Sequence, residues 1–174
     1  MNIVLIGFKS SGKSTVGAML AKHAGMTFTD TDSVLETLFF EETGVQRGCR
    51  DIYAEKGAEY MRALETKTLG MLAETEETVL ATGGGVVLCP ENIPLLQKIG
   101  IRVFLDVPLA VLETRLAGSD SPLFARKSMA DVYAERYPLY KNAADLLYAV
   151  EPEHTPVQLA EKIYEKIVGE KYGQ

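Results

Sequence analysis

Residues 7–15 read Gly7-Phe8-Lys9-Ser10-Ser11-Gly12-Lys13-Ser14-Thr15, which fits the pattern G-x-x-x-x-G-K-[ST]. A short apolar run, Asn2–Ile6, comes directly before this stretch, and apolar residues at helical spacing follow it over Ser14–Ala24. In that setting successive backbone N–H groups face a phosphate, and the helix N-terminus adds a favourable dipole. The Lys13 ammonium is then expected on the β- and γ-phosphates, and the Ser14 hydroxyl on Mg²⁺. We therefore predict a nucleotide-binding loop rather than a Gly/Ser-rich turn without a ligand. Its expected contact residues are Ser10, Ser11, Gly12, Lys13, Ser14 and Thr15.

The same order of a short apolar run and a helical pattern continues along the chain, as in repeated βα units. The expected strands are Asn2–Ile6, Thr27–Asp30, Thr78–Thr82, Ile101–Asp106 and Leu146–Val150. The expected helices are Ser14–Ala24, Val34–Glu41, Ala58–Glu74, Pro90–Lys98, Pro108–Leu116, Ser128–Ala144 and Pro156–Val168. The pattern predicts an α/β fold: a five-stranded parallel sheet with helices on both faces.

Composition limits the class of protein. The chain has 174 residues, 47 % of them hydrophobic and 24 % charged, which is typical of one globular domain and excludes a disordered tail or a disulfide scaffold. Its apolar runs are too short to span a membrane, and its start lacks the pattern of a signal peptide. A net charge of −6 argues against sequence-independent binding to nucleic acid. Cys49 and Cys89 are interpreted as free thiols of a reducing compartment, and we expect a cytoplasmic protein.

Two polar segments follow expected strands at the sheet edge where ligands of such folds bind. Asp30-Thr31-Asp32 ends the second strand, and its carboxylates would point to opposite sides of an extended chain, one toward a metal and one toward an acceptor hydroxyl. A helix N-cap is the alternative interpretation of this pair. Gly83-Gly84-Gly85 follows the third strand, and three glycines leave one wall open for a ligand, whereas a plain turn needs one.

Two arginines in helical segments, Arg62 and Arg136, are candidates for binding a carboxylate, because the planar guanidinium matches a carboxylate in shape and charge. Taken alone, each pattern favours a solvated surface arginine over a functional one. They become informative only if the substrate is an acid.

Taken in order, these segments resemble the shikimate kinase family. The resemblance rests on the loop at 7–15, Asp30-Thr31-Asp32, Ala81-Thr82-Gly83-Gly84-Gly85-Val86, Arg136-Tyr137-Pro138-Leu139-Tyr140, and a stretch from Asp51-Ile52-Tyr53 through Arg62 to Glu65. It implies a three-layer P-loop kinase fold and a single domain over 1–174, with an acceptor lobe at about 32–62 and a mobile lid at about 117–127. It also implies a monomer that uses ATP and Mg²⁺ to phosphorylate shikimate to shikimate 3-phosphate, in the pathway to chorismate and the aromatic amino acids, with no nucleic-acid or membrane partner.

The resemblance also implies roles for single residues. Lys13 and Asp32 would be catalytic, with Asp32 orienting or deprotonating the acceptor hydroxyl. Arg62 and Arg136 would hold the shikimate carboxylate. Gly84 would contact the ring. The remaining implied positions are Gly83 and Gly85 beside the substrate, Ser14 and Asp30 at the metal, and Arg115 and His154 on the nucleotide side.

One position departs from the family pattern. The family lid carries an arginine where this chain has Ser121, and Arg126 is the best replacement, with Lys127 the next. The stretch from Asp32 to Arg62 is also several residues longer than usual. Two alternatives therefore stay open: a related P-loop kinase for another small hydroxylated acid, and a nucleotide-binding module of low activity.

Overall fold

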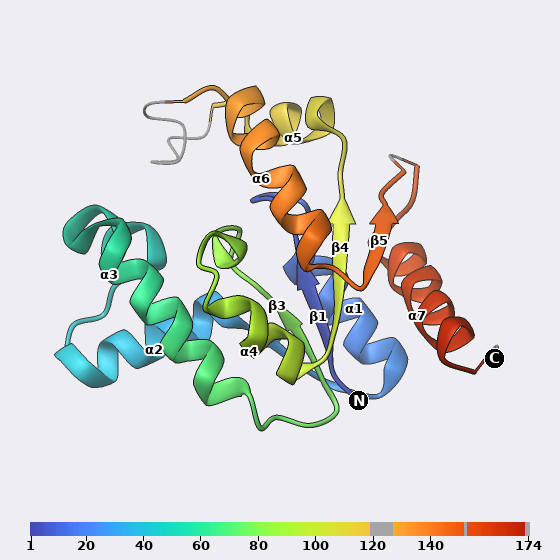
Figure 1. Ribbon diagram of the computed structural model, residues 1–174, viewed down its shortest axis with the longest axis horizontal. Helices are drawn as coiled ribbons and strands as arrows, with labels where there is room; N and C mark the ends of the chain where they lie inside the picture. The colour runs from blue at the N-terminus through green and yellow to red at the C-terminus, as the bar shows by residue number, and fades with distance from the viewer. Residues whose placement is uncertain (119–126, 152, 173–174) are drawn as a thin grey trace.

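The computed structural model describes residues 1–118, 127–151 and 153–172. Its centre is a parallel sheet of five strands in the order β2-β3-β1-β4-β5 (Figure 1). The strands are β1 (Ile3–Ile6), β2 (Thr27–Asp30), β3 (Thr78–Ala81), β4 (Ile101–Asp106) and β5 (Leu146–Ala149). Each lies within one residue of the bounds expected from the sequence, so the predicted sheet is confirmed.

Burial follows the position of each strand in the sheet. β1 lies between β3 and β4, and its four side chains are fully buried, because helices cover both faces of a central parallel strand. The edge strands β2 and β5 are only partly buried. The apolar runs of the central strands thus form the core and fix the sheet edge at which the functional loops meet.

The helices complete a three-layer arrangement (Figure 1). α1 (Lys13–Ala24) and α7 (Pro156–Tyr172) pack against each other on one face of the sheet. The opposite face carries α4 (Asn92–Ile99) and α6 (Met129–Ala143), and the 3₁₀ turn η1 (Val86–Leu88) packs against both helices. The remaining helices are α2 (Thr31–Thr43), α3 (Cys49–Leu72) and α5 (Leu109–Leu116).

Helix α2 begins three residues earlier than expected. The Asp30 side chain caps it by accepting a hydrogen bond from the Asp32 backbone N–H, 3.0 Å away. Asp32 therefore lies in the first turn of a helix. The expectation of two carboxylates on opposite sides of an extended chain is wrong, because the strand ends at Asp30.

Helix α3 begins at Cys49, nine residues before the expected start, and bends at Gly57. Gly57 has φ +85°, a left-handed conformation that favours glycine, and it separates two helical segments. Of residues 49–56 only Ile52 is fully buried, so apolar periodicity gives no sign of the first segment.

Helices α2 and α3 share a small apolar core of their own, separate from the core around the sheet. Its buried members are Leu35, Leu38, Phe39, Ile52, Met61 and Leu64. This core holds the two helices beside the carboxyl edge of the sheet, within the segment expected to form an acceptor lobe. In the described part of the chain, no helix combines the length and the apolar composition that crossing a membrane requires.

Candidate active site

The loop at 7–15 joins β1 to α1 through backbone conformations that few residues adopt. Gly7 has φ +149° and Gly12 has φ +94°, and a Cβ on Gly7 would lie 3.1 Å from the Leu105 carbonyl oxygen. Ser10 also has a positive φ, +63°. Gly12 is the N-cap of α1 and offers no side-chain oxygen to its first N–H groups. The start of α1 is therefore left with donors and a positive dipole end for an anion.

Lys13 folds back into this loop and is buried. Its Nζ donates to the Gly7 and Phe8 carbonyl oxygens, 2.9 and 2.7 Å away, and to Ser11 Oγ at 3.3 Å. Burial lowers the pKa of Lys13 to about 8, and the negative charges of Asp32 and Asp30 oppose this shift. The hydrogen-bond partners of the ammonium are neutral oxygens, so a bound polyphosphate would give it a negatively charged partner. The loop is therefore suited to a phosphate ligand. Among the other expected contact residues, Ser11 is buried and Ser14 and Thr15 are exposed.

Ser14 and Asp30 meet at the start of α1 and α2. Ser14 Oγ donates to Asp30 Oδ2 at 2.5 Å, so a hydroxyl and a carboxylate oxygen lie together beside the phosphate loop. Mg²⁺ prefers oxygen ligands and is usually held by one or two protein groups plus phosphates and water. Across 1–118, 127–151 and 153–172, no cluster of three or more His, Cys, Asp or Glu could hold a metal alone. The pair fits a magnesium ion brought in with a nucleotide.

Asp32 lies next to the first glycine of Gly83–Gly85. A Cβ on Gly83 would be 2.7 Å from Asp32 Oδ1, so this close approach requires glycine. Burial raises the pKa of Asp32, and the charge of Asp30 adds to the shift, while Lys13 opposes it. A half-buried carboxylate with a raised pKa is better able to accept a proton from a hydroxyl than an ordinary aspartate.

Arg62, on the second segment of α3, is fixed by a buried carboxylate. Its Nη1 forms an ion pair with Oε2 of Glu65, one turn further along the helix. Burial raises the pKa of Glu65, and the Arg62 charge opposes this shift. A Cβ on Gly85 would lie 2.0 Å from Arg62 Nη1, so the glycine leaves the space that the guanidinium occupies.

Arg136 reaches the same loop from α6. Its Nη1 donates to the Gly84 carbonyl oxygen at 3.2 Å, and the buried Tyr140 hydroxyl donates to the same oxygen. Burial raises the pKa of Tyr140 to about 12, so this hydroxyl keeps its proton. The glycine loop is thus held between α3 and α6.

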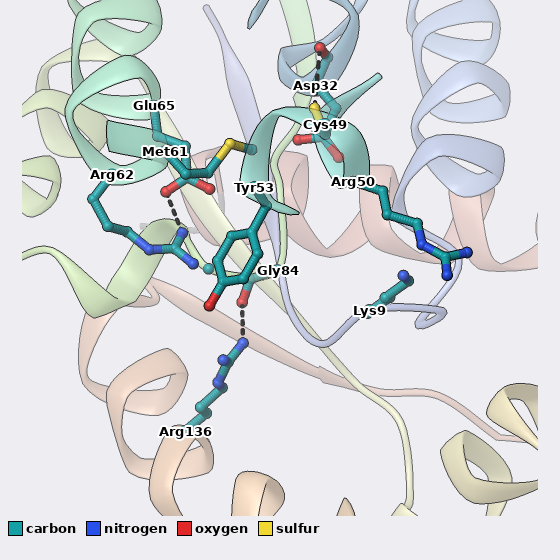
Figure 2. A pocket seen from close by; sticks show the side chains of 11 residues that line it. Lys9, Asp32, Cys49, Arg50, Tyr53, Met61, Arg62, Glu65, Gly84 and Arg136 are labelled. Atoms are coloured by element: carbon teal, nitrogen blue, oxygen red, sulfur yellow. Dashed lines mark hydrogen bonds and ion pairs between the residues drawn. The ribbon is translucent and has the colours of Figure 1, made fainter. Parts of the chain in front are cut away.

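These groups surround a cavity of about 220 Å³ (Figure 2). Of the residues expected from the sequence, it brings together Asp32, Arg62, Gly84, Gly85 and Arg136. The lining also includes residues that the sequence analysis did not assign to a site: Lys9, Cys49, Arg50, Tyr53, Met61 and Glu65. A signal was available for Glu65, because Arg and Glu three residues apart on a helix are neighbours. The first segment of α3, which supplies three of the others, was not expected at all.

A sequence model of shikimate kinase matches residues 9–168 of the chain. A shikimate kinase from a Nostoc species is 36 % identical over 172 residues, which cover 96 % of this chain and 91 % of that protein. A solved shikimate kinase from Acinetobacter baumannii, in complex with shikimate, has TM-score 0.83 and 31 % identity, and the match covers 98 % of this chain and 94 % of that one. The shikimate kinase of Aquifex aeolicus matches over the full length of both chains with TM-score 0.81 and 32 % identity. The chain belongs to the shikimate kinase family.

This membership confirms the expected family, fold class and enzyme class, a P-loop kinase. Single residue roles stay predictions, and so does the division of the chain into acceptor lobe and lid. Arg126 and Ser121, where the sequence departs from the family lid, lie outside the described residues, and so does most of the expected lid.

Two expected nucleotide-side residues lie away from the cavity. Arg115, near the end of α5, donates from Nη1 to the Ser10 carbonyl oxygen at 3.0 Å, so it is tied to the phosphate loop. His154 lies in the loop between β5 and α7, where its Nε2 is 2.7 Å from Lys162 Nζ and 3.4 Å from a Glu151 carboxylate oxygen. The geometry therefore places Arg115, but not His154, next to the phosphate loop.

Proposed function

We propose that the protein transfers the γ-phosphoryl group of ATP to the 3-hydroxyl of shikimate, a step in the biosynthesis of the aromatic amino acids. The observation that carries this proposal is the cavity in which Asp32, Arg62 and Arg136 converge beside the phosphate loop of a shikimate kinase family member. An acid with several hydroxyls has the two kinds of group that such a cavity can bind: a carboxylate for arginines and a hydroxyl for an aspartate.

On the nucleotide side, the loop N–H groups and Lys13 bind the polyphosphate. When the nucleotide binds, the Lys13 ammonium exchanges its hydrogen bonds to two carbonyl oxygens and a hydroxyl for contacts with the phosphates. It then stays with the transferring phosphoryl group, where negative charge is concentrated. Ser14 and Asp30 would hold Mg²⁺, which neutralises charge on the β- and γ-phosphates when it is bound.

On the acceptor side, Arg136 and Arg62 bind the carboxylate and thereby fix the ring. Asp32 accepts the proton of the hydroxyl that attacks, and burial favours this because it raises the pKa of the carboxyl. Phosphoryl transfer needs little covalent chemistry from the protein, so positioning of this kind supplies most of the rate. We further propose that the protein acts as a monomer, as its resemblance to the family implies.

A coupled ADP-release assay over a panel of hydroxylated acids tests the proposal. Shikimate should stimulate ADP release far above quinate, gluconate or no acceptor, and ³¹P NMR should identify a phosphate monoester at the 3-position. Stimulation by another acid alone would favour the related-kinase alternative, and nucleotide binding without any acceptor-dependent turnover would favour a binding module.

A further inference from the structure

Tyr53 lines the cavity but has no part in the roles given above. It lies on the first segment of α3, one turn after Cys49, and its side chain is half-buried. Its ring packs against the small apolar core that α2 and α3 share. The ring is therefore fixed by packing, and the hydroxyl is the part of this side chain that can act on a ligand.

The Tyr53 side chain lies between the two functional ends of the cavity (Figure 2). Figure 2 shows its hydroxyl pointing to the side where Arg62 and Arg136 lie, whereas Asp32 lies on the opposite side of the ring. The hydroxyl is thus directed to the end of the cavity where the arginines would bind a carboxylate. It points away from the aspartate that would receive the proton of the reacting hydroxyl.

A ligand that fills the cavity changes the surroundings of this hydroxyl. Among residues 1–118, 127–151 and 153–172 it has no hydrogen-bond partner, and water in the open cavity suffices as one. An acceptor that occupies the cavity of about 220 Å³ displaces that water, and a polar group left without a partner then costs free energy. Tyr53 therefore favours ligands that offer it a new partner over ligands that do not.

A carboxylate held by the two arginines is the partner that fits this position. The guanidinium groups of Arg62 and Arg136 can only donate, so neither can accept from the tyrosine hydroxyl. The Glu65 carboxylate in the same cavity is already paired with Arg62. A ligand carboxylate has about four acceptor positions, which leaves room for a third donor beside two arginines. A hydrogen bond from a hydroxyl to an ionised carboxylate is also stronger than one between neutral groups.

We propose that the Tyr53 hydroxyl donates a hydrogen bond to the carboxylate of the bound acceptor, as a third contact beside Arg62 and Arg136, and so selects for acids. This inference rests on the proposed function and deepens it by adding a specificity-determining residue. The contact is the same before and during phosphoryl transfer, because the carboxylate takes no part in the reaction. Its loss should therefore raise KM and leave kcat nearly unchanged.

Titration calorimetry and steady-state kinetics on the full chain test this with Tyr53→Phe, which keeps the ring and removes only the hydroxyl. The Kd and KM for shikimate should rise about tenfold, the loss of a hydrogen bond to a charged group. The kcat and the Kd for a non-hydrolysable ATP analogue should stay within about twofold. The control Tyr60→Phe removes the same atom from a tyrosine that packs on the same apolar core outside the cavity lining, and it should match the unaltered protein. Unchanged shikimate affinity in Tyr53→Phe, or an equal loss for the ATP analogue or in Tyr60→Phe, would overturn the inference.

A double variant tests whether the partner is the carboxylate. In an Arg136→Lys background the carboxylate is held differently, so removal of the Tyr53 hydroxyl should lower kcat/KM less than about threefold instead of about tenfold. The same tenfold loss in both backgrounds would overturn the assignment to the carboxylate. If the unaltered protein bound no shikimate, the proposed function and this inference would fail together. Equal shikimate binding by the unaltered protein and Tyr53→Phe would overturn the inference alone.

Discussion

The phosphate loop and the acceptor cavity lie side by side but are built in opposite ways. The loop consists of nine consecutive residues, and the hydrogen bonds of its buried Lys13 join residues at most six positions apart. Distant residues add single hydrogen bonds to it, between Asp30 and Ser14 and between Arg115 and Ser10. The cavity takes its lining from the phosphate loop, α2, both segments of α3, Gly84 and Gly85, and α6. Its contacts span up to 56 positions, as between Tyr140 and Gly84.

This difference determines how each region responds to substitution. A change in the loop removes groups that the nucleotide needs in every reaction, so it should stop turnover whatever the acceptor. A change in the cavity removes one of several anchors on one substrate, so its effect should be smaller and confined to that substrate.

The largest effect is expected for Lys13→Ala. Loss of a preorganised cation at the transferring group should lower kcat about 10³-fold. The fold should stay intact, because the buried ammonium is held at the cost of desolvation. Coupled ADP release and thermal unfolding measure the two quantities, with the exposed Lys22→Ala on the same helix as control. Undiminished ADP release from a folded Lys13→Ala protein would contradict the assignment of the loop.

Asp32→Asn should come next, with kcat lowered about 10²-fold, because the amide keeps the shape of the carboxyl but cannot take a proton. In the unaltered protein kcat/KM should fall on the acid side as the raised pKa of Asp32 is crossed, since only the ionised carboxylate is a base. Asp32→Asn should lose this acid limb. A variant that kept both kcat and the limb would exclude Asp32 as the base.

Much of the fold, and the loop in full, was predictable because both depend on local pattern. The central strands are short buried apolar runs, and their expected bounds are correct within one residue. The first segment of α3 was missed, because Gly57 ends its pattern and few of its side chains are buried. Tyr53 lies on that segment, so no local pattern could bring it to the cavity.

For the cavity, residue types were predictable but their arrangement was not. Arg62 and Arg136 were candidates, yet nothing near either residue shows that Gly84 and Gly85 bring them to one place. Glu65 acts through Arg62, and its burial becomes evident only once α3 is packed. Asp30 fits its N-cap interpretation, since its side chain caps α2. It also accepts a hydrogen bond from Ser14, and its role at a metal stays a prediction.

A matched pair of glycine substitutions, one at the acceptor cavity and one outside it, should give an effect smaller than those of Lys13→Ala and Asp32→Asn. Gly85→Ala places a methyl group on the Arg62 guanidinium and should weaken shikimate about tenfold, the cost of displacing one charge-assisted contact. Gly70→Ala, on α3 with open space around it, should leave binding unchanged and stabilise the helix by up to about 1 kcal/mol. Calorimetry and thermal unfolding measure these effects. Equal shikimate affinity in both variants would mean that Arg62 does not hold the acceptor.

Raising the pH should weaken ATP binding by a factor similar to the loss of shikimate affinity expected for Gly85→Ala, or smaller. Because burial holds the pKa of Lys13 at about 8 and bound polyphosphate raises it, binding above pH 8 must take up a proton. The Kd for ATP should therefore rise about tenfold from pH 7 to pH 9, with no matching change for shikimate. Lys13→Arg keeps its charge at these pH values and should show no such rise. A flat profile in the unaltered protein would show that Lys13 is not the titrating group.

Crossed titrations test the division into two separable regions most directly. Shikimate and a non-hydrolysable ATP analogue are each titrated into the unaltered protein, Lys13→Ala and Arg136→Ala. We predict that Arg136→Ala weakens shikimate about 10- to 100-fold, the loss of a charge-assisted hydrogen bond, and leaves the ATP analogue within about twofold. Lys13→Ala should show the reverse pattern. If Arg136→Ala weakened the ATP analogue as strongly as shikimate, the cavity beside the phosphate loop would not be a separate acceptor site, and the account would be contradicted.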